Sequence, residues 1–116
     1  MSGTWADSWG SQHIIDPFAW TMTDGDATSR FHIATIDDVA GWVVARNDAA
    51  NAYNAGAWSR IEWYWDSLGA LLMCQSTYDA ASQENALAAP LADREDPLAG
   101  GCGGFAWTAM TPTVTR

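Results

Sequence analysis

The sequence has no lysine, only two histidines and two cysteines, and no apolar run near the roughly 18 residues of a membrane span. Its acidic residues outnumber the arginines, 14 to 5, which gives a net charge of -9. Such a surface repels phosphate groups, so we expect neither nucleic acid nor an acidic membrane as a partner, and no membrane insertion. Hydrophobic residues make up 48% of the chain and charged ones 16%, which predicts one folded domain over residues 1–116.

The two cysteines, Cys74 and Cys102, lack the pattern of a zinc site, because no CxxC and no suitably spaced histidine pair accompanies them. Cys102 lies in a glycine-rich run, 100–104, which a disulfide would restrain. We therefore predict a Cys74–Cys102 disulfide, with two free thiols in a cytosolic protein as the alternative. The disulfide implies an extracytoplasmic protein (secreted, periplasmic or part of a lipid-anchored parent) whose export signal is not in this chain. We expect neither a metal nor a cofactor.

Most of the chain has the pattern of short strands separated by turn residues, at 4–7, 12–16, 18–23, 29–36, 41–47, 58–66, 70–77 and 105–110. The clearest alternation lies in 58–66, where two faces differ in character: Ile61, Trp63 and Trp65 against Arg60, Glu62 and Tyr64. We expect the first face to point inward and the second to be solvated. Asp79–Ala89 is predicted to be a helix with Asp79 as its N-cap, stopped by Pro90.

Seven or eight strands joined mainly by tight connections predict an all-β fold. A sheet of this kind loses its exposed edges by closing on itself, so the favoured architecture is a small antiparallel up-and-down barrel with one short helix. A β-sandwich is the alternative.

The opening Gly3-Thr4-Trp5-Ala6-Asp7-Ser8-Trp9-Gly10-Ser11, followed by Ile14, resembles the first strand of the avidins. Its Gly-x-Trp element is shared with the lipocalins, and both families belong to the calycin barrels; the rest of the chain we interpret as an exported bacterial domain. The resemblance implies a calycin-like barrel with Trp5 closing its base. It also implies ligand contacts at Asp7 and Ser11, where avidins place an asparagine and a serine that donate to the ureido oxygen of biotin. An ionised Asp7 offers only acceptors and would repel that oxygen, so we expect a ligand other than biotin.

Eight tryptophans are more than a small core readily accommodates, and an eight-stranded barrel is just wide enough for side chains or one small ligand. We therefore favour a non-enzymatic small-molecule-binding barrel, with ligand contacts assigned to Asp7, Ser11, Trp20, His32, Trp42, Trp63 and Trp65. One alternative is a carbohydrate-binding module that stacks sugars on exposed tryptophans. The other is a small barrel isomerase or cyclase using His32 or Asp7, although no nucleophile motif accompanies the histidines and no catalytic residue is assigned.

Three further features have two interpretations each. The histidines, His13 and His32, are either packing residues or, beside Asp7 or Glu62, part of an acid–base or metal site. The loop 47–58 is either ordinary turn structure or a hydrogen-bonding surface for a sugar or another polar ligand. The acidic runs 24–26 and 93–96 carry oxygen ligands but lack the spacing of a known calcium loop, so turn chemistry is favoured.

Overall fold

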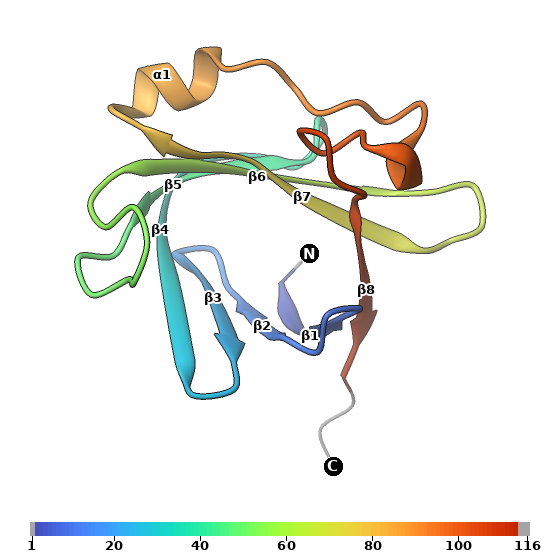
Figure 1. Cartoon of the computed structure of the whole chain (residues 1–116), viewed down its shortest axis with the longest axis horizontal. Coiled ribbons are helices and arrows are strands. Elements are labelled where there is room, and N and C mark those ends of the chain that lie inside the picture. Colours follow the sequence, from blue (N-terminus) through green and yellow to red (C-terminus); the bar gives the residue numbers. More distant parts are fainter. Residues whose placement is uncertain (1, 114–116) are drawn as a thin grey trace.

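The computed structural model describes residues 2–113, which form a closed antiparallel barrel of eight strands in up-and-down order (Figure 1). The strands are β1 Gly3–Asp7, β2 Gln12–Ile15, β3 Ala19–Asp24, β4 Ala27–Asp37, β5 Trp42–Asn47, β6 Trp58–Trp65, β7 Leu71–Ala80 and β8 Thr108–Pro112. Each strand pairs with the next, and β8 closes the sheet against β1 between Trp5↔Pro112 and Asp7↔Met110. The predicted all-β barrel is confirmed, and closure excludes the sandwich.

The barrel interior is filled by alternate side chains of all eight strands, because successive residues of a strand point to opposite faces of the sheet. The buried inner cluster consists of Trp5, Ile15, Trp20, Phe31, Val43, Ala45, Ile61, Trp63, Leu71, Met73 and Met110. Ile61 and Trp63 belong to it, so the predicted inward orientation is confirmed for these two residues. Trp65, the third residue of the predicted inward face, lies at the end of β6 and is 59% exposed.

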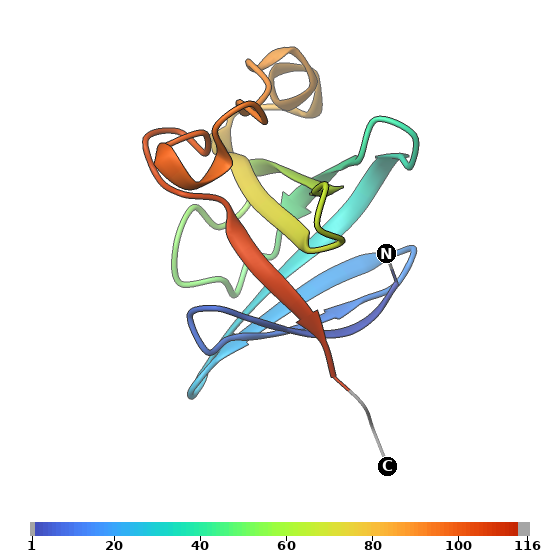
Figure 2. The same ribbon diagram turned by 90° about the vertical axis from the view of Figure 1, so that its right-hand side faces the viewer.

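A second layer covers the outer face of β5, β6 and β7 (Figures 1 and 2). This segment, residues 81–107, is called the cover, and it contains helix α1 (Gln83–Ala88) and the 3-10 helix η1 (Pro97–Ala99). The predicted helix start is wrong: Ser82, not Asp79, caps α1 by accepting the N–H of Asn85 at 3.1 Å. Residue 79 instead lies in β7, which extends to the pair Trp58↔Ala80.

The outer face of β6 is buried under the cover, so the expectation of a solvated face is wrong. Arg60 is 2% exposed and Glu62 is 0% exposed. The Arg60 guanidinium donates to Ser76 Oγ (3.1 Å) and to three carbonyls of the cover, those of Ala86 (3.1 Å), Ala89 (2.7 Å) and Pro90. Glu62 Oε2 accepts the N–H of Ala92 at 3.0 Å and lies 3.7 Å from Arg60 Nε. These two charged side chains therefore fasten the cover to the barrel.

A disulfide between Cys74 of β7 and Cys102 fixes the far end of the cover, as predicted, with the two Cα atoms 5.7 Å apart. Cys74 is buried with Leu72 and Trp107 in a small cluster outside the barrel wall. Within residues 2–113, no helix has the length and apolar character needed to cross a bilayer.

Candidate ligand-binding site

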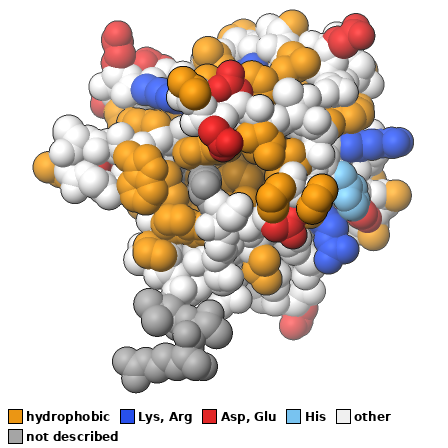
Figure 3. All heavy atoms as spheres, turned by 180° about the vertical axis from the view of Figure 1, so that it is seen from behind, with side chains coloured by type: hydrophobic (Ala, Val, Ile, Leu, Met, Phe, Trp, Pro, Cys, Tyr) orange, Lys and Arg blue, Asp and Glu red, His pale blue; other side chains and the backbone are white. Residues whose placement is uncertain are grey.

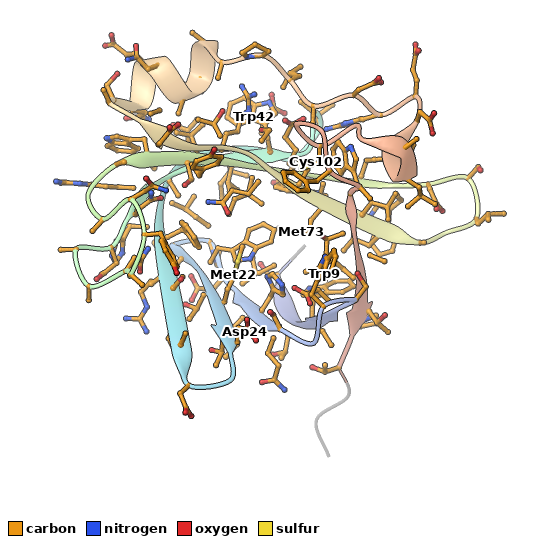
Figure 4. All side chains as sticks on the ribbon, in the orientation of Figure 1. Trp9, Met22, Asp24, Trp42, Met73 and Cys102 are labelled. Carbon is orange, nitrogen blue, oxygen red and sulfur yellow. A yellow bond between two sulfur atoms is a disulfide. The ribbon has the colours of Figure 1, made fainter. Side chains whose placement is uncertain are left out.

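A cavity of about 430 Å³ opens at the end of the barrel where β1 finishes, which we call the mouth. Its lining comes from β1, β2, β3, β7 and β8 and from the end of the cover, and Figure 4 shows Trp9, Met22 and Met73 around it. Trp9 and Phe105 stand at its rim, each 78% exposed. The volume is within the range of small-molecule sites, which runs from about 300 to 1,000 Å³.

The cavity arises where the pairing of β7 with β8 stops. Strand β8 pairs with β7 only from Leu71↔Met110 to Met73↔Thr108, although β7 continues to Ala80. From Cys74 onward, this edge of β7 faces the cavity and the end of the cover instead of a strand. The disulfide at Cys74 holds the end of the cover beside the gap, so a covalent bond fixes the position of the cover at the opening.

One wall of the mouth carries a chain of hydrogen bonds from the core to the cavity. The Trp20 indole donates to His13 Nδ1 at 2.9 Å, and His13 Nε2 lies 2.8 Å from Asp7 Oδ2. Because the indole N–H needs a bare nitrogen, the hydrogen of His13 is on Nε2 and is donated to Asp7. Asp7 Oδ1 accepts the backbone N–H groups of Trp9 and Ser11, each at 2.9 Å. Both ring nitrogens of His13 are thus engaged within the protein.

The Asp7 carboxylate is ionised at neutral pH. Burial by itself would raise its pKa, but the hydrogen bonds from His13 and from the N–H groups of Ser11 and Trp9 outweigh this and lower the pKa below the ordinary value of 3.8. The side chain is 8% exposed and lines the mouth cavity. The site therefore holds a fixed negative charge.

A second hydrogen-bond chain lies on β5, β6 and β7 at the same end of the barrel. Asn47 Nδ2 donates to the carbonyls of Asn54 and Tyr78, each at 2.9 Å, so its Oδ1 is the atom that accepts from Ser59 Oγ at 2.6 Å. Ser59 has then used its hydrogen, and it accepts from Gln75 Nε2 at 3.1 Å. This order leaves the side-chain carbonyl oxygen of Gln75, a residue of the cavity lining, as an acceptor.

The loop after β5 holds a hollow of about 200 Å³ that shares Met22, Gln75 and Tyr78 with the mouth cavity. Two of its three asparagines, Asn47 and Asn51, serve the fold: Asn51 Oδ1 accepts the N–H of Arg30 and its Nδ2 donates to the Arg30 carbonyl, both at 2.9 Å. With Asn47 bonded in the same way, these two amides are not available to a ligand. A polar ligand in this hollow would therefore find the Asn54 amide, but not those of Asn47 and Asn51.

The structure brings some of the predicted site residues together. Asp7 lines the mouth, and Trp20 and Trp63 are buried deeper in the barrel. Ser11 contributes its backbone N–H to Asp7. Trp5 is buried in the core and meets Trp65 edge-on with 6.1 Å between ring centroids, so Trp65 lies at the opposite end of the barrel, the base.

Two predicted ligand contacts, His32 and Trp42, require correction because they lie on the outer surface. The inward positions of β4 and β5 belong to their neighbours Phe31 and Val43, and strand alternation turns the adjacent side chains outward. The His32 side chain is 51% exposed and bonds to Asp48 at 2.7 Å. Trp42 lies between the sheet and the cover (Figure 4).

Sequence reasoning missed Met22, Met73 and Gln75 as site residues, and it considered His13 only as a packing residue or as part of an acid–base or metal site. His13 and Met22 are paired across β2 and β3, and Met73 pairs with Trp63 of β6, two residues from the last pair at Trp65↔Leu71. The alternation of His13 with Ile15 placed both on one face of a strand. The missing information was the register that sets His13 beside Asp7 and Trp20.

At the base, a smaller hollow of about 150 Å³ is lined mainly by apolar residues, among them Trp20, Ile33 and Trp63. Exposed apolar side chains surround this end, including Phe18, Val39 and Leu68. Figure 3, the view from behind, shows apolar side chains over the middle of that face. Asp16 and Asp38 also line the base hollow, and Asp16 Oδ1 accepts the N–H groups of Phe18 and Ala19 at 2.7 and 2.8 Å.

Searches against protein-family models, curated proteins and solved structures found no match to this chain. The coarse resemblance noted in the sequence agrees with the fold, since a closed eight-stranded antiparallel barrel with one short helix is consistent with a calycin-like barrel. In residues 2–113, no group of three or more His, Cys, Asp or Glu side chains is placed to hold a metal ion.

Proposed function

We propose that this protein is a non-enzymatic binding barrel that holds a small molecule at its mouth. The observation that carries the proposal is the cavity of about 430 Å³, in which apolar walls such as Met22 and Met73 surround two oriented polar groups, Asp7 and Gln75. Small-molecule sites typically combine an apolar lining with a few placed hydrogen-bonding groups.

The state of the histidines supports binding over acid–base catalysis. A general base needs a free nitrogen within reach of substrate, but both nitrogens of His13 are bonded, one to Asp7 and one to Trp20. His32 and its partner Asp48 lie outside the barrel. The isomerase or cyclase alternative therefore has no histidine with a free ring nitrogen among the described residues of the mouth.

The avidin-like start supports a ligand site at the mouth and disfavours biotin. Asp7 stands where the resemblance places an asparagine, and its carboxylate already accepts three hydrogen bonds from the protein. An ionised acceptor repels the ureido oxygen that an asparagine would bind. The ligand that we propose is therefore different from biotin in its polar group.

A metabolite library monitored by tryptophan emission and melting temperature tests the proposal. Ligands that raise the melting temperature of the wild type should lose this effect in Met22→Trp, which fills the mouth. The matched control, Thr111→Trp, adds the same ring on the exposed face of β8 and should leave binding unchanged. Equal binding by Met22→Trp, or a library without any response, would contradict the proposal.

A carbohydrate-binding module is the second candidate, favoured by the exposed aromatic rings near the mouth: Trp9, Tyr53, Tyr78 and Phe105. Sugars stack on such rings, and this mode needs no enclosed cavity. Oligosaccharide titrations separate the two candidates. Sugar binding that Trp9→Ala abolishes and Met22→Trp preserves would favour the carbohydrate module.

The buried Cys74–Cys102 disulfide supports an extracytoplasmic location, since such bonds persist in oxidising compartments. Protein isolated from its host should gain no mass on thiol-reactive labelling before reduction, and reduction itself should add two hydrogens. Two free thiols in the isolated protein would contradict this part of the proposal.

A further inference from the structure

We infer that the mouth cavity selects ligands that carry a protonated amine on an apolar, ring-bearing body, with the Asp7 carboxylate as the anchor. This inference rests on the proposed binding function and names the chemical class of the ligand. Three observations carry it: the negative charge of Asp7, the acceptor atoms that Asp7 and Gln75 present to the cavity, and the aromatic rings at the rim.

The charge of Asp7 has no cationic partner in the site. Its carboxylate is bonded by two backbone N–H groups and by the N–H of His13, all from neutral groups. Among the described residues that line the cavity, none is an arginine, and the chain has no lysine. A ligand cation would therefore supply the only compensating charge, and the net charge of -9 raises the local concentration of cations.

The two amide or carboxylate side chains of the lining, Asp7 and Gln75, both present acceptors, while the hydroxyls of Ser76, Tyr78 and Thr108 can donate or accept. Asp7 keeps acceptor capacity beyond its three bonds, because a carboxylate has about four lone-pair sites. Gln75 gives its Nε2 to Ser59, which leaves its carbonyl oxygen for a ligand donor. An ammonium group has several donors and no acceptor, whereas a carboxylate or carbonyl on the ligand would meet acceptors of its own kind.

The remainder of the lining fits an apolar body with a ring. Met22 and Met73 supply flexible thioethers that pack against aromatic rings, and Trp9 and Phe105 place two more rings at the rim. Aromatic faces also attract cations within about 6 Å. The rim and the anchor thus favour the same ligand class.

Three probes of nearly equal shape test the inference: 2-phenylethylamine, 2-phenylethanol and 3-phenylpropanoate. Calorimetric titration of the wild type should give at least tenfold tighter binding of the amine than of the alcohol, and the weakest binding for the carboxylate. In Asp7→Asn, the advantage of the amine should disappear while the affinity for the alcohol is kept. Asp26→Asn is the matched control, since it removes the same charge from the exposed turn between β3 and β4 and should preserve the selectivity.

The outcomes distinguish the two proposals. If the alcohol or the carboxylate binds the wild type as tightly as the amine, the ammonium inference is overturned, while the proposal of a small-molecule site at the mouth stands. Loss of selectivity in Asp26→Asn as well as in Asp7→Asn would assign it to overall charge and would also overturn the anchor. If none of the three probes binds and the library shows no response, both proposals fail. The wild-type comparison decides the inference even if Asp7→Asn does not fold.

Discussion

The substitution Arg60→Met is expected to loosen the cover from the barrel wall. Methionine retains much of the apolar stem of arginine but none of its donors. The carbonyls of Ala86, Ala89 and Pro90 would lose the guanidinium that they share, and Glu62 would lose its buried counter-charge at 3.7 Å. The other cation near Glu62, Arg94, is also 3.7 Å away but lies at the edge of the cover and bonds to the Ala40 carbonyl.

The expected loss of stability follows from what is left behind. Removing one partner of a buried ion pair costs about 3–5 kcal/mol, because the other charge remains buried without compensation. Each buried carbonyl without a donor costs about 1–3 kcal/mol, although water reaches these groups once the cover moves. We expect a total near 4 kcal/mol, since the terms overlap. A domain of this size has about 5–15 kcal/mol of stability, so the variant should fold but with a weakened cover.

Guanidinium unfolding followed by tryptophan emission measures this loss, and hydrogen exchange locates it. Amides of α1 should lose protection before those of β1 to β3. Arg46→Met on the exposed face of β5 is the control and should change stability by about 0.5 kcal/mol or less. The double variant Arg60→Met/Glu62→Leu should recover part of the loss, because apolar replacement of a buried pair is often neutral. A loss below about 1 kcal/mol for Arg60→Met would refute the assigned role of the pair.

Three other expectations concern the framework and the mouth. Replacing Cys74 and Cys102 with alanine should cost about 3.5 kcal/mol in denaturant unfolding, given the sequence separation of 28; a cost below about 1 kcal/mol would contradict it. Gly41→Ala should lower stability by about 2 kcal/mol more than Gly69→Ala. Both glycines have φ above +80°, but only at position 41 would a Cβ lie 2.3 Å from a carbonyl oxygen, that of Trp63. Equal losses would argue against this clash. Because the pKa of Asp7 is lowered in the folded state, its ionised form stabilises the fold above about pH 4, and this contribution is lost as pH falls through the folded-state pKa. The melting temperature of Asp7→Asn should therefore fall less steeply below about pH 4 than that of the wild type. An unchanged slope would count against this role of Asp7.

Much of the fold was accessible from local patterns. The alternation in 58–66 matches β6, and the Asp-Gly turn signal at 24–26 matches the tight connection between β3 and β4. The cysteine in a glycine-rich run predicted the disulfide that forms. These features are local because turn chemistry and the two-residue period of a strand act over a few neighbouring positions.

The candidate site depended on contacts between distant segments. A two-residue period separates the faces of a strand but does not say which face is inside, so His32 and Trp42 were placed inward when their neighbours occupy the core. Likewise, the pattern of β6 gave no sign that residues 81–107 would fold back and bury Arg60 and Glu62.

The sequence by itself thus indicated the strands to within a few residues, with the last one predicted at 105–110 and found at Thr108–Pro112, together with most of the turns and the favoured disulfide. Only the tertiary structure decided that β8 closes on β1, that the cover buries a charged face, and that His13 stands between Trp20 and Asp7. The physical reason is that register and burial follow from the closure of the whole sheet. Closure removes exposed strand edges and buries apolar surface from all strands at once. The resulting free energy depends on the whole sheet and cannot be estimated from any one segment of the sequence.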